Sequence, residues 1–325
     1  MPDILVVALG GTAGLRASDD ALVGSMRRGG ASVALARVAS AREPRTFALT
    51  DLAWAVPARR AAAAALREAR PRAIVYATTT AALLWPEPGA IRFDSPAAAN
   101  RPGRHGIWQR PVERRCFSAA PLLLPTSEGA LAEAPAPHAP AIVVPIPVAP
   151  SGPPAPERDI AAITYGANPA KKGLDRVLAA WRAARREGET LVVAGVSGTA
   201  EDGVRYTGMI AAEDYRALLR RARVFVTAPR WEDYGLAQLE ALADGCVLVT
   251  NEGPGPYAAL PLARELDSRL VGEALAGALR VALDDPLDGY AERAAALLAP
   301  FAPGAVDAVV AERVLPALLG SQRVR

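Results

Sequence analysis

Residues 230–249 read RWEDYGLAQLEALADGCVLV and combine a polar loop, a glycine and an apolar helical run that leads into a strand. The loop follows VFVTAP (224–229), a continuous apolar run typical of a buried strand. Glu232 lies on the loop, whereas Glu240 falls more than one turn inside the helix that opens near Gly235. Ligands of open α/β sheets bind beyond the carboxyl ends of the strands, so the two acids are candidates to hold parts of one extended ligand. The alternative is two solvated acids.

The same alternation of apolar strands and amphipathic helices extends over both halves of the chain. In the second half we expect strands at 159–166, 190–196, 204–209, 224–229 and 246–251, with helices at 172–186, 213–221 and 236–244. In the first half we expect strands at 4–9, 31–38, 73–78 and 90–95, with helices within 19–28, around 57–69 and at about 111–120. Continuous apolar strands joined by helices predict parallel sheets that are covered on both faces.

Nine prolines between Pro135 and Pro156 mark the connection between the two halves. A stretch so poor in amide donors does not form the middle of a sheet or a helix. Within it, AIVV (141–144) predicts a short strand. The connection divides the chain into domains 1–150 and 151–302, and AVDAVVAERVLPALLG (305–320) has the pattern of a terminal amphipathic helix.

Composition and charge exclude several classes of protein. A hydrophobic content of 51% with 22% charged residues is typical of globular domains, and a net charge of +3 does not favour nucleic acid binding. We expect no bilayer-spanning segment and, because Asp3 stands where a signal peptide carries positive charge, no signal peptide. Cys116 and Cys246 predict free thiols in a reducing compartment, and with His105 and His138 they supply no zinc or multi-histidine metal cluster.

A second motif, ITYGANPAKKGLDRVLAAW (163–181), is a strand that ends in Gly166, a loop, and two lysines before an amphipathic helix. A lysine at a helix entrance adds its charge to the helix dipole and the free amides, which together favour phosphate. Lys171 and Lys172 therefore predict a phosphate site, or else a solvated basic turn.

In their order along the chain, these motifs resemble the donor-binding domain of glycosyltransferase family 4. The similar segments are YGANPAKKGLDRVLAAW (165–181), LVVAGVSG (191–198) and the long stretch 204–255. The first half is similar more loosely, through its glycine-rich first loop and through 110–127 and 143–149. The resemblance implies a GT-B fold: two doubly wound Rossmann-like α/β domains facing a central cleft. It also implies that 1–150 lies on the acceptor side, that 151–302 binds the donor, and that a terminal helix at about 303–325 rejoins the first domain.

Carried over position by position, the resemblance implies that Lys172 binds the diphosphate of a nucleotide sugar. Glu232 would bond a sugar hydroxyl and Glu240 the ribose hydroxyls, and we take Lys172 and Glu232 as the candidate catalytic residues. Gly235 and Leu236 would offer backbone amides to the phosphates or the sugar. The remaining donor-side candidates are Gly10, Gly11, Thr12, Lys171 and Gly166, with Gly195, Met209 and Ile210 near the base.

The sequence departs from the family pattern at two places. An arginine usually follows the glycine of the first donor loop, where this chain has Ala167, and Lys171, Arg230 and Arg16 are the candidates to replace its charge. A histidine that the family often carries at a strand end of the acceptor domain is not evident. The acceptor-side candidates are Asp94, Arg92 and His105.

The resemblance implies a retaining glycosyltransferase that moves a hexose-type sugar from a nucleotide-diphosphate sugar, and we expect it to need no metal or cofactor. No D-x-D motif occurs, and Lys172 with the amides of 235–236 is suited to stabilise a leaving phosphate. The departures leave open a non-catalytic sugar-nucleotide binder or partner subunit. A nucleotide-sugar epimerase on the same plan and a dinucleotide enzyme are weaker alternatives, because ALGGTAGL (8–15) lacks the G-x-G-x-x-G spacing.

The stretch NRPGRHGIWQRPVERR (100–115) gathers five arginines, one histidine and Trp108. It fits a site for an anionic acceptor or a membrane face carrying a phospholipid-linked sugar, or a solvated loop and helix face. We therefore expect a nucleotide-sugar donor, a sugar, lipid-linked or small-molecule acceptor, and no nucleic acid partner. The expected location is cytoplasmic, in solution or peripherally at the inner face of the membrane.

Overall fold

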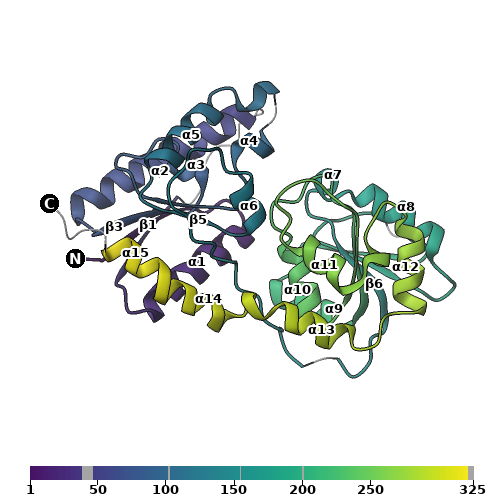
Figure 1. The fold of residues 1–325 in the computed structure, drawn as a ribbon. Coiled ribbons are helices and arrows are strands. Elements are labelled where there is room, and N and C mark those ends of the chain that lie inside the picture. The colour runs from purple at the N-terminus through teal and green to yellow at the C-terminus, as the bar shows by residue number, and fades with distance from the viewer. Residues whose placement is uncertain (39–46, 102, 154, 200, 321–325) are drawn as a thin grey trace. The chain divides into compact units, whose positions relative to one another are not determined.

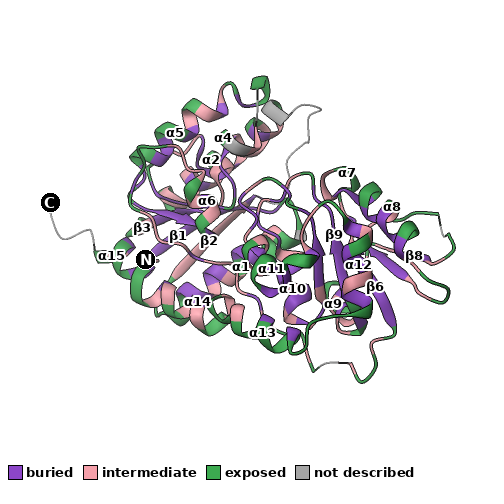
Figure 2. Ribbon diagram, turned by 45° about the vertical axis from the view of Figure 1, so that its right-hand side comes forward, coloured by how far each residue is buried: buried purple, intermediate pink, exposed green. Residues whose placement is uncertain are grey.

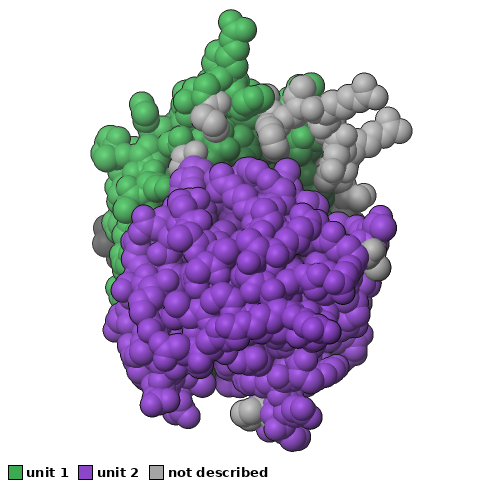
Figure 3. Space-filling view, turned by 90° about the vertical axis from the view of Figure 1, so that its right-hand side faces the viewer, with its two compact units in different colours: residues 1–147, 303–325 green, residues 148–302 purple. Residues whose placement is uncertain are grey.

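The computed structural model describes residues 1–38, 47–101, 103–153, 155–199 and 201–320, and the chain divides into two compact units. Unit 1 consists of Met1–Pro147 and Pro303–Arg325, and unit 2 of Val148–Ala302 (Figures 1 and 3). Figure 2 shows that the strands of both units are largely buried. No helix of the described segments is both long and apolar enough to cross a membrane.

Unit 1 is built on a five-stranded parallel sheet of order β2-β1-β3-β4-β5. Its strands are β1 (Ile4–Leu9), β2 (Val33–Val38), β3 (Ala73–Tyr76), β4 (Ala90–Phe93) and β5 (Leu123–Pro125). All six residues of β1 are buried, because the strand is apolar on both faces and lies between two other strands. The stretch AIVV at 141–144 makes only an isolated bridge between Ala141 and Leu123, so the strand expected there is wrong.

Helices cover both faces of this sheet. They are α1 (Ala13–Arg28), α2 (Phe47–Glu68), α3 (Thr79–Ala82), α4 (Ala97–Asn100), the 3-10 turn η1 (Gly103–Gly106), α5 (Gln109–Ala119) and α6 (Glu128–Ala132). Ile4 and Val6 belong to the core cluster under α1, whereas Leu5 and Val7 belong to the cluster under α2 and α5. Successive residues of a strand point to opposite faces, so one apolar strand serves two cores.

The last helical stretch completes the core under α1. It comprises α14 (Pro303–Val309), the π-helical segment η4 (Val310–Val314) and α15 (Leu315–Gly320). Val310 and Val314 are fully buried in the same cluster as Met26 of α1. At the surface, the guanidinium of Arg28 donates to both carboxylate oxygens of Asp307 at 2.7 and 2.8 Å. The end of the described chain is therefore an integral part of unit 1.

Unit 2 has a second five-stranded parallel sheet, of order β10-β9-β6-β7-β8. Its strands are β6 (Ile160–Tyr165), β7 (Leu191–Ala194), β8 (Val204–Gly208), β9 (Ala222–Thr227) and β10 (Val247–Thr250). Its helices are α7 (Pro169–Lys172), α8 (Leu174–Ala184), α9 (Ala212–Arg221), α10 (Leu236–Ala243), α11 (Ala259–Asp267), η2 (Ser268–Leu270), α12 (Leu275–Asp284), α13 (Tyr290–Leu297) and η3 (Ala299–Phe301). The order reverses between β6 and β9, and such a switch point leaves a crevice at the carboxyl ends of the two strands.

The helix expected at 172–186 is divided in two at Gly173. This glycine has φ +63°, and a Cβ built on it would lie 1.9 Å from the carbonyl oxygen of Ala228. Only glycine avoids both the strain and the clash. Lys172 consequently ends the short helix α7 instead of opening the long helix α8, because the chain turns sharply where it passes the end of β9.

Candidate functional site

Lys172 and Glu232 form an ion pair in unit 2, with Nζ 2.6 Å from Oε2. Lys172 ends α7 after β6, and Glu232 lies on the loop between β9 and α10. Because β6 and β9 are adjacent parallel strands, their following loops leave the same edge of the sheet, at the switch point. The lysine side chain is 19% exposed and the glutamate side chain 5% exposed. The structure thus brings both candidate catalytic residues together at the edge where ligands of such sheets bind.

The two loops are fastened to each other by further contacts. The amide of Arg230 donates to the carbonyl of Lys171 at 2.9 Å, and its guanidinium forms an ion pair with Asp175 at 2.6 Å. The side chains of Lys171 and Asp233 form another ion pair. Lys171 and Arg230 are the two candidates of unit 2 to replace the charge missing at Ala167. Each of them therefore forms an ion pair with a carboxylate of unit 2.

Gly235 starts α10 beside this pair. It has φ +89°, and a Cβ there would lie 2.7 Å from the ring of Tyr257. Among the described residues, no side chain caps the helix, so its first amides, beginning at Leu236, are not satisfied by a capping side chain. Free amides at a helix start attract anions, in keeping with the roles expected of Gly235 and Leu236.

Glu240 lies inside α10 and has different partners from Glu232. One of its carboxylate oxygens is 3.6 Å from the guanidinium of Arg216, which also binds Asp244 at 2.6 Å. Burial raises the pKa of Glu240, the Arg216 guanidinium opposes this rise, and Asp244 adds to it. The side chain remains 25% exposed, which leaves it available to a ligand.

The other donor-side candidates of unit 2 lie at the carboxyl ends of β6, β7 and β8. Gly166 is buried, and a Cβ there would lie 2.8 Å from a methyl of Val196. Gly195 has φ +82° and packs against the ring of Tyr165. Met209, directly after β8, is 76% exposed, whereas Ile210 is half-buried. At this edge of the sheet, which also carries Lys172, the exposed Met209 side chain offers an apolar surface against which a planar group can pack.

Gly10, Gly11 and Thr12 form the first loop of unit 1, after β1. Gly10 is buried and Gly11 exposed, while the Thr12 hydroxyl caps α1 by accepting from the amide of Leu15 at 3.1 Å. The guanidinium of Arg16 donates to the carbonyl of Gly10 at 2.7 Å. Arg16, the third candidate to replace the charge at Ala167, therefore lies against this loop of unit 1.

The three acceptor-side candidates lie in different surroundings within unit 1. Asp94, after β4, and His105, in η1, are exposed. Arg92 is only 3% exposed, donates to the Ser18 hydroxyl at 2.8 Å and lies 3.6 Å from the carboxylate of Asp19. This corrects the expectation that Arg92 faces an acceptor, because its guanidinium is committed to the interior. Buried strand positions admit arginine only where a counter-charge exists, and Asp19 was not recognised in the sequence.

Sequence reasoning also missed Gln238 and Tyr257, two buried polar residues beside Glu232. Gln238 Nε2 donates to Glu232 Oε2 at 3.1 Å, and the Tyr257 hydroxyl is bonded to Thr250 Oγ1 at 2.8 Å. Burial raises the pKa of Tyr257, and the negative charge of Glu232 contributes to that rise. The available signal for Gln238 was an uncharged polar residue in the mainly apolar run LAQLEALA (236–243).

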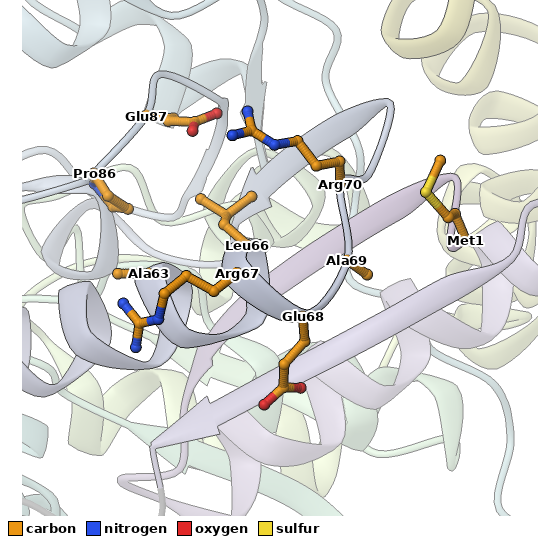
Figure 4. A pocket seen from close by; sticks show the side chains of 9 residues that line it. All are labelled: Met1, Ala63, Leu66, Arg67, Glu68, Ala69, Arg70, Pro86 and Glu87. Atoms are coloured by element: carbon orange, nitrogen blue, oxygen red, sulfur yellow. The ribbon is translucent and has the colours of Figure 1, made fainter.

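The pocket in Figure 4, at the end of α2, is lined by Met1, Ala63, Leu66, Arg67, Glu68, Ala69, Arg70, Pro86 and Glu87 and belongs to unit 1. In the described segments, no group of three or more His, Cys, Asp or Glu residues could hold a metal ion. Cys116 and Cys246 are free and buried.

Comparison with known proteins agrees with this arrangement. Residues 159–298 match the family model for glycosyl transferases group 1, whereas no curated protein matches the chain. Sucrose-phosphate synthase from Thermosynechococcus elongatus is similar in structure, with 14% identity over 98% of this chain and 99% of that chain and a TM-score of 0.68. An E. coli structure described as trehalose-6-phosphate bound with UDP-2-fluoro glucose is similar at 13% identity over 99% of both chains, with a TM-score of 0.70.

WaaG, a glycosyltransferase involved in lipopolysaccharide biosynthesis, is also similar, with 15% identity, coverage of 91% of this chain and 99% of that chain, and a TM-score of 0.56. At these identities the likeness establishes the fold, and it confirms the expected α/β architecture of two Rossmann-like units. The matched model covers most of unit 2, including Lys172, Glu232 and Glu240. The chain thus has the GT-B fold, and its second unit carries a glycosyl transferases group 1 domain at residues 159–298.

Proposed function

We propose that the protein is a retaining glycosyltransferase of the family 4 type, which transfers a hexose from a nucleotide-diphosphate sugar without a metal ion. The Lys172–Glu232 pair at the switch point of unit 2 is the observation that carries the proposal. It joins an ammonium suited to a diphosphate with a carboxylate suited to a sugar hydroxyl. The similar E. coli structure, which holds UDP-2-fluoro glucose, supports a donor of this class.

In the proposed reaction, the bond between the anomeric carbon and the diphosphate oxygen breaks, and its electron pair stays on that oxygen. Lys172 and the free amides at the start of α10 stabilise the growing negative charge. The acceptor oxygen bonds to the same face of the anomeric carbon, and its proton passes to the leaving diphosphate. Glu232 orients the sugar through a hydroxyl, and Glu240 binds the ribose.

The donor is to be found by a thermal-shift screen of UDP-glucose, GDP-mannose, ADP-glucose and dTDP-glucose, because a ligand of the native state raises the melting temperature. With the best donor, Lys172→Ala and Glu232→Ala are each expected to lower turnover more than tenfold, which corresponds to about 1.4 kcal/mol of lost transition-state stabilisation. Arg176→Ala, an exposed site on α8, is the control and should retain wild-type turnover. Near-normal turnover in either site variant would reject its role.

Two finer parts of the proposal have their own measurements. Retention is checked by the anomeric configuration of the first product in NMR spectra. Metal independence is checked by turnover in excess EDTA, which should equal turnover with added Mg²⁺ or Mn²⁺. A donor that binds tightly but undergoes neither transfer nor slow hydrolysis would favour the non-catalytic alternative. A reducing compartment such as the cytoplasm agrees with the two free, buried thiols.

For the acceptor, we favour a molecule presented at an anionic membrane surface to which unit 1 binds. Besides Met1, three large apolar side chains of unit 1 are exposed, namely Leu49 at 52%, Leu52 at 39% and Ile107 at 68%. Leu49 and Leu52 lie at the start of α2, and Ile107 follows η1, which contacts α2. Arg104 of η1 is also exposed, as are Arg114 and Arg115 of α5. Surfaces that bind at the interface of an anionic membrane typically combine apolar side chains with cations.

A further inference from the structure

Helix α10 places an amide side chain against Glu232 in the interior of unit 2. Gln238 is 1% exposed, and its Nε2 donates to Glu232 Oε2 at 3.1 Å. Leu242, one turn further along α10, is also buried. A buried amide lowers stability unless its hydrogen-bonding groups are paired. The bond to Glu232 is therefore the interaction that accounts for a glutamine at this position.

The second amide atom of Gln238 is not satisfied. Its Oε1 is buried and accepts no hydrogen bond from the residues that the structure describes. Burial raises the pKa of nearby Tyr257, and the hydrogen bond between its hydroxyl and Thr250 opposes this rise. A residue selected for stability alone would have an apolar side chain of the same volume here. The unsatisfied oxygen points to a role of Gln238 in the function of Glu232.

Lys172 and Gln238 donate to the same carboxylate oxygen. Both hydrogen bonds that Glu232 accepts through its side chain fall on Oε2, at 2.6 Å from Lys172 and 3.1 Å from Gln238. In the described part of the chain, no donor is bonded to the other oxygen, Oε1. A carboxylate fixed through one oxygen holds its other oxygen in a defined direction, which suits that oxygen to accept a hydrogen bond from a hydroxyl of a ligand.

We propose that Gln238 is a positioning residue that keeps Glu232 oriented when Lys172 turns to the diphosphate. The inference rests on the proposed function, in which Lys172 binds phosphate and Glu232 binds the sugar. An ammonium that moves to a diphosphate weakens its bond to Glu232 Oε2, and the Gln238 amide then becomes the remaining restraint on that oxygen. Gln238 consequently contributes little in the donor-free protein and much when the sugar is bound.

The test is Gln238→Met, which keeps the side-chain length and removes both amide groups. The melting temperature should be equal to or above that of the wild type, because the unsatisfied oxygen is lost with the donor. We expect turnover to fall about tenfold with the best nucleotide sugar of the screen, a loss in the range that misplaced catalytic groups produce. Binding of the corresponding nucleoside diphosphate should be unchanged, while the extra affinity contributed by the sugar should disappear.

Leu239→Met is the matched control, because Leu239 is a buried neighbour on α10 without a polar group to offer Glu232, and it should retain turnover and sugar affinity. A melting temperature that falls in parallel with turnover would assign Gln238 a structural role only and overturn the inference. Unchanged sugar affinity and turnover in Gln238→Met would also overturn it, while leaving the proposed function intact. A wild-type protein that binds no nucleotide diphosphate or nucleotide sugar would overturn both.

Discussion

Two buried carboxylates, one in each unit, differ in the hydrogen bonds that they receive. In unit 1, Asp19 is fully buried with Arg92 at 3.6 Å, and neither carboxylate oxygen accepts a hydrogen bond from the described residues. Burial raises the pKa of Asp19 to about 7, and Arg92 only partly opposes the rise. In unit 2, the buried carboxylate of Glu232 receives two hydrogen bonds.

Asp19 therefore makes the stability of the protein depend on pH. Because its folded pKa of about 7 exceeds the ordinary value of 3.8, the folded state holds a proton that the unfolded state releases. Its stabilising contribution is complete below pH 4 and is lost as the pH rises through 7. With about 1.4 kcal/mol per pKa unit, the free energy of unfolding should fall by roughly 2 to 4 kcal/mol across this range.

Asp19→Asn mimics the protonated acid and should flatten this fall, as measured by urea unfolding at several pH values. Glu113, whose pKa burial also raises to about 7, will leave a residual slope. Asp288→Asn, at an exposed position of unit 2, is the control, and its pH profile should match the wild type. An Asp19→Asn profile as steep as the wild type would contradict the assignment.

Among the elements, the break between α7 and α8 has the most direct bearing on the site. It places Lys172 at the end of a short turn, at hydrogen-bonding distance from Glu232. Strands β1, β6 and β9 follow from apolar continuity, which is a local property of the sequence. The position of the break between α7 and α8 does not follow from apolar continuity. It depends on how closely Gly173 approaches Ala228, some fifty residues further along the chain. Gln238 escaped recognition for the same reason: its partner is not local.

Gly173→Ala is expected to destabilise the protein by about 3 kcal/mol or more, since the added methyl meets the Ala228 carbonyl at 1.9 Å and φ is +63°. Gly188→Ala is a matched control: φ is +81° there, but no atom lies within 4 Å of the added methyl, so only the backbone cost of about 1 kcal/mol applies. Urea unfolding of both variants measures the difference. Equal destabilisation would mean that backbone strain alone makes glycine necessary at Gly173.

At the scale of the whole molecule, each unit carries its own sheet, core and switch point. The order β2-β1-β3-β4-β5 reverses beside β1, where the Gly10 loop begins, as unit 2 reverses beside β6. This architecture could be predicted, because strand and helix alternate throughout both halves. The exposed apolar surface at Leu52 and Ile107 could not be predicted from the sequence, since the exposure of these side chains depends on how α2 and η1 pack.

Binding to membranes is a property of this surface as a whole. The protein should sediment with phosphatidylcholine vesicles that contain phosphatidylglycerol and not with phosphatidylcholine alone, and added salt should release it. Ile107→Ser and Arg114→Ala should each weaken binding about fivefold, in line with about 1 kcal/mol per contact. Leu287→Ser, at a 36% exposed position of unit 2, is the control. Equal sedimentation with both kinds of vesicle, or none with either, would contradict the proposal that this surface binds anionic membranes.

The helical segment Pro303–Gly320 also has a consequence for biosynthesis. Unit 2 is complete at Ala302, whereas the core of unit 1 requires Val310 and Val314, which leave the ribosome later. The second unit can thus finish folding while the first, although synthesised earlier, still lacks part of its interior. Nascent chains stalled just after unit 2 should therefore expose the apolar face of α1 to chaperones until the final turns emerge.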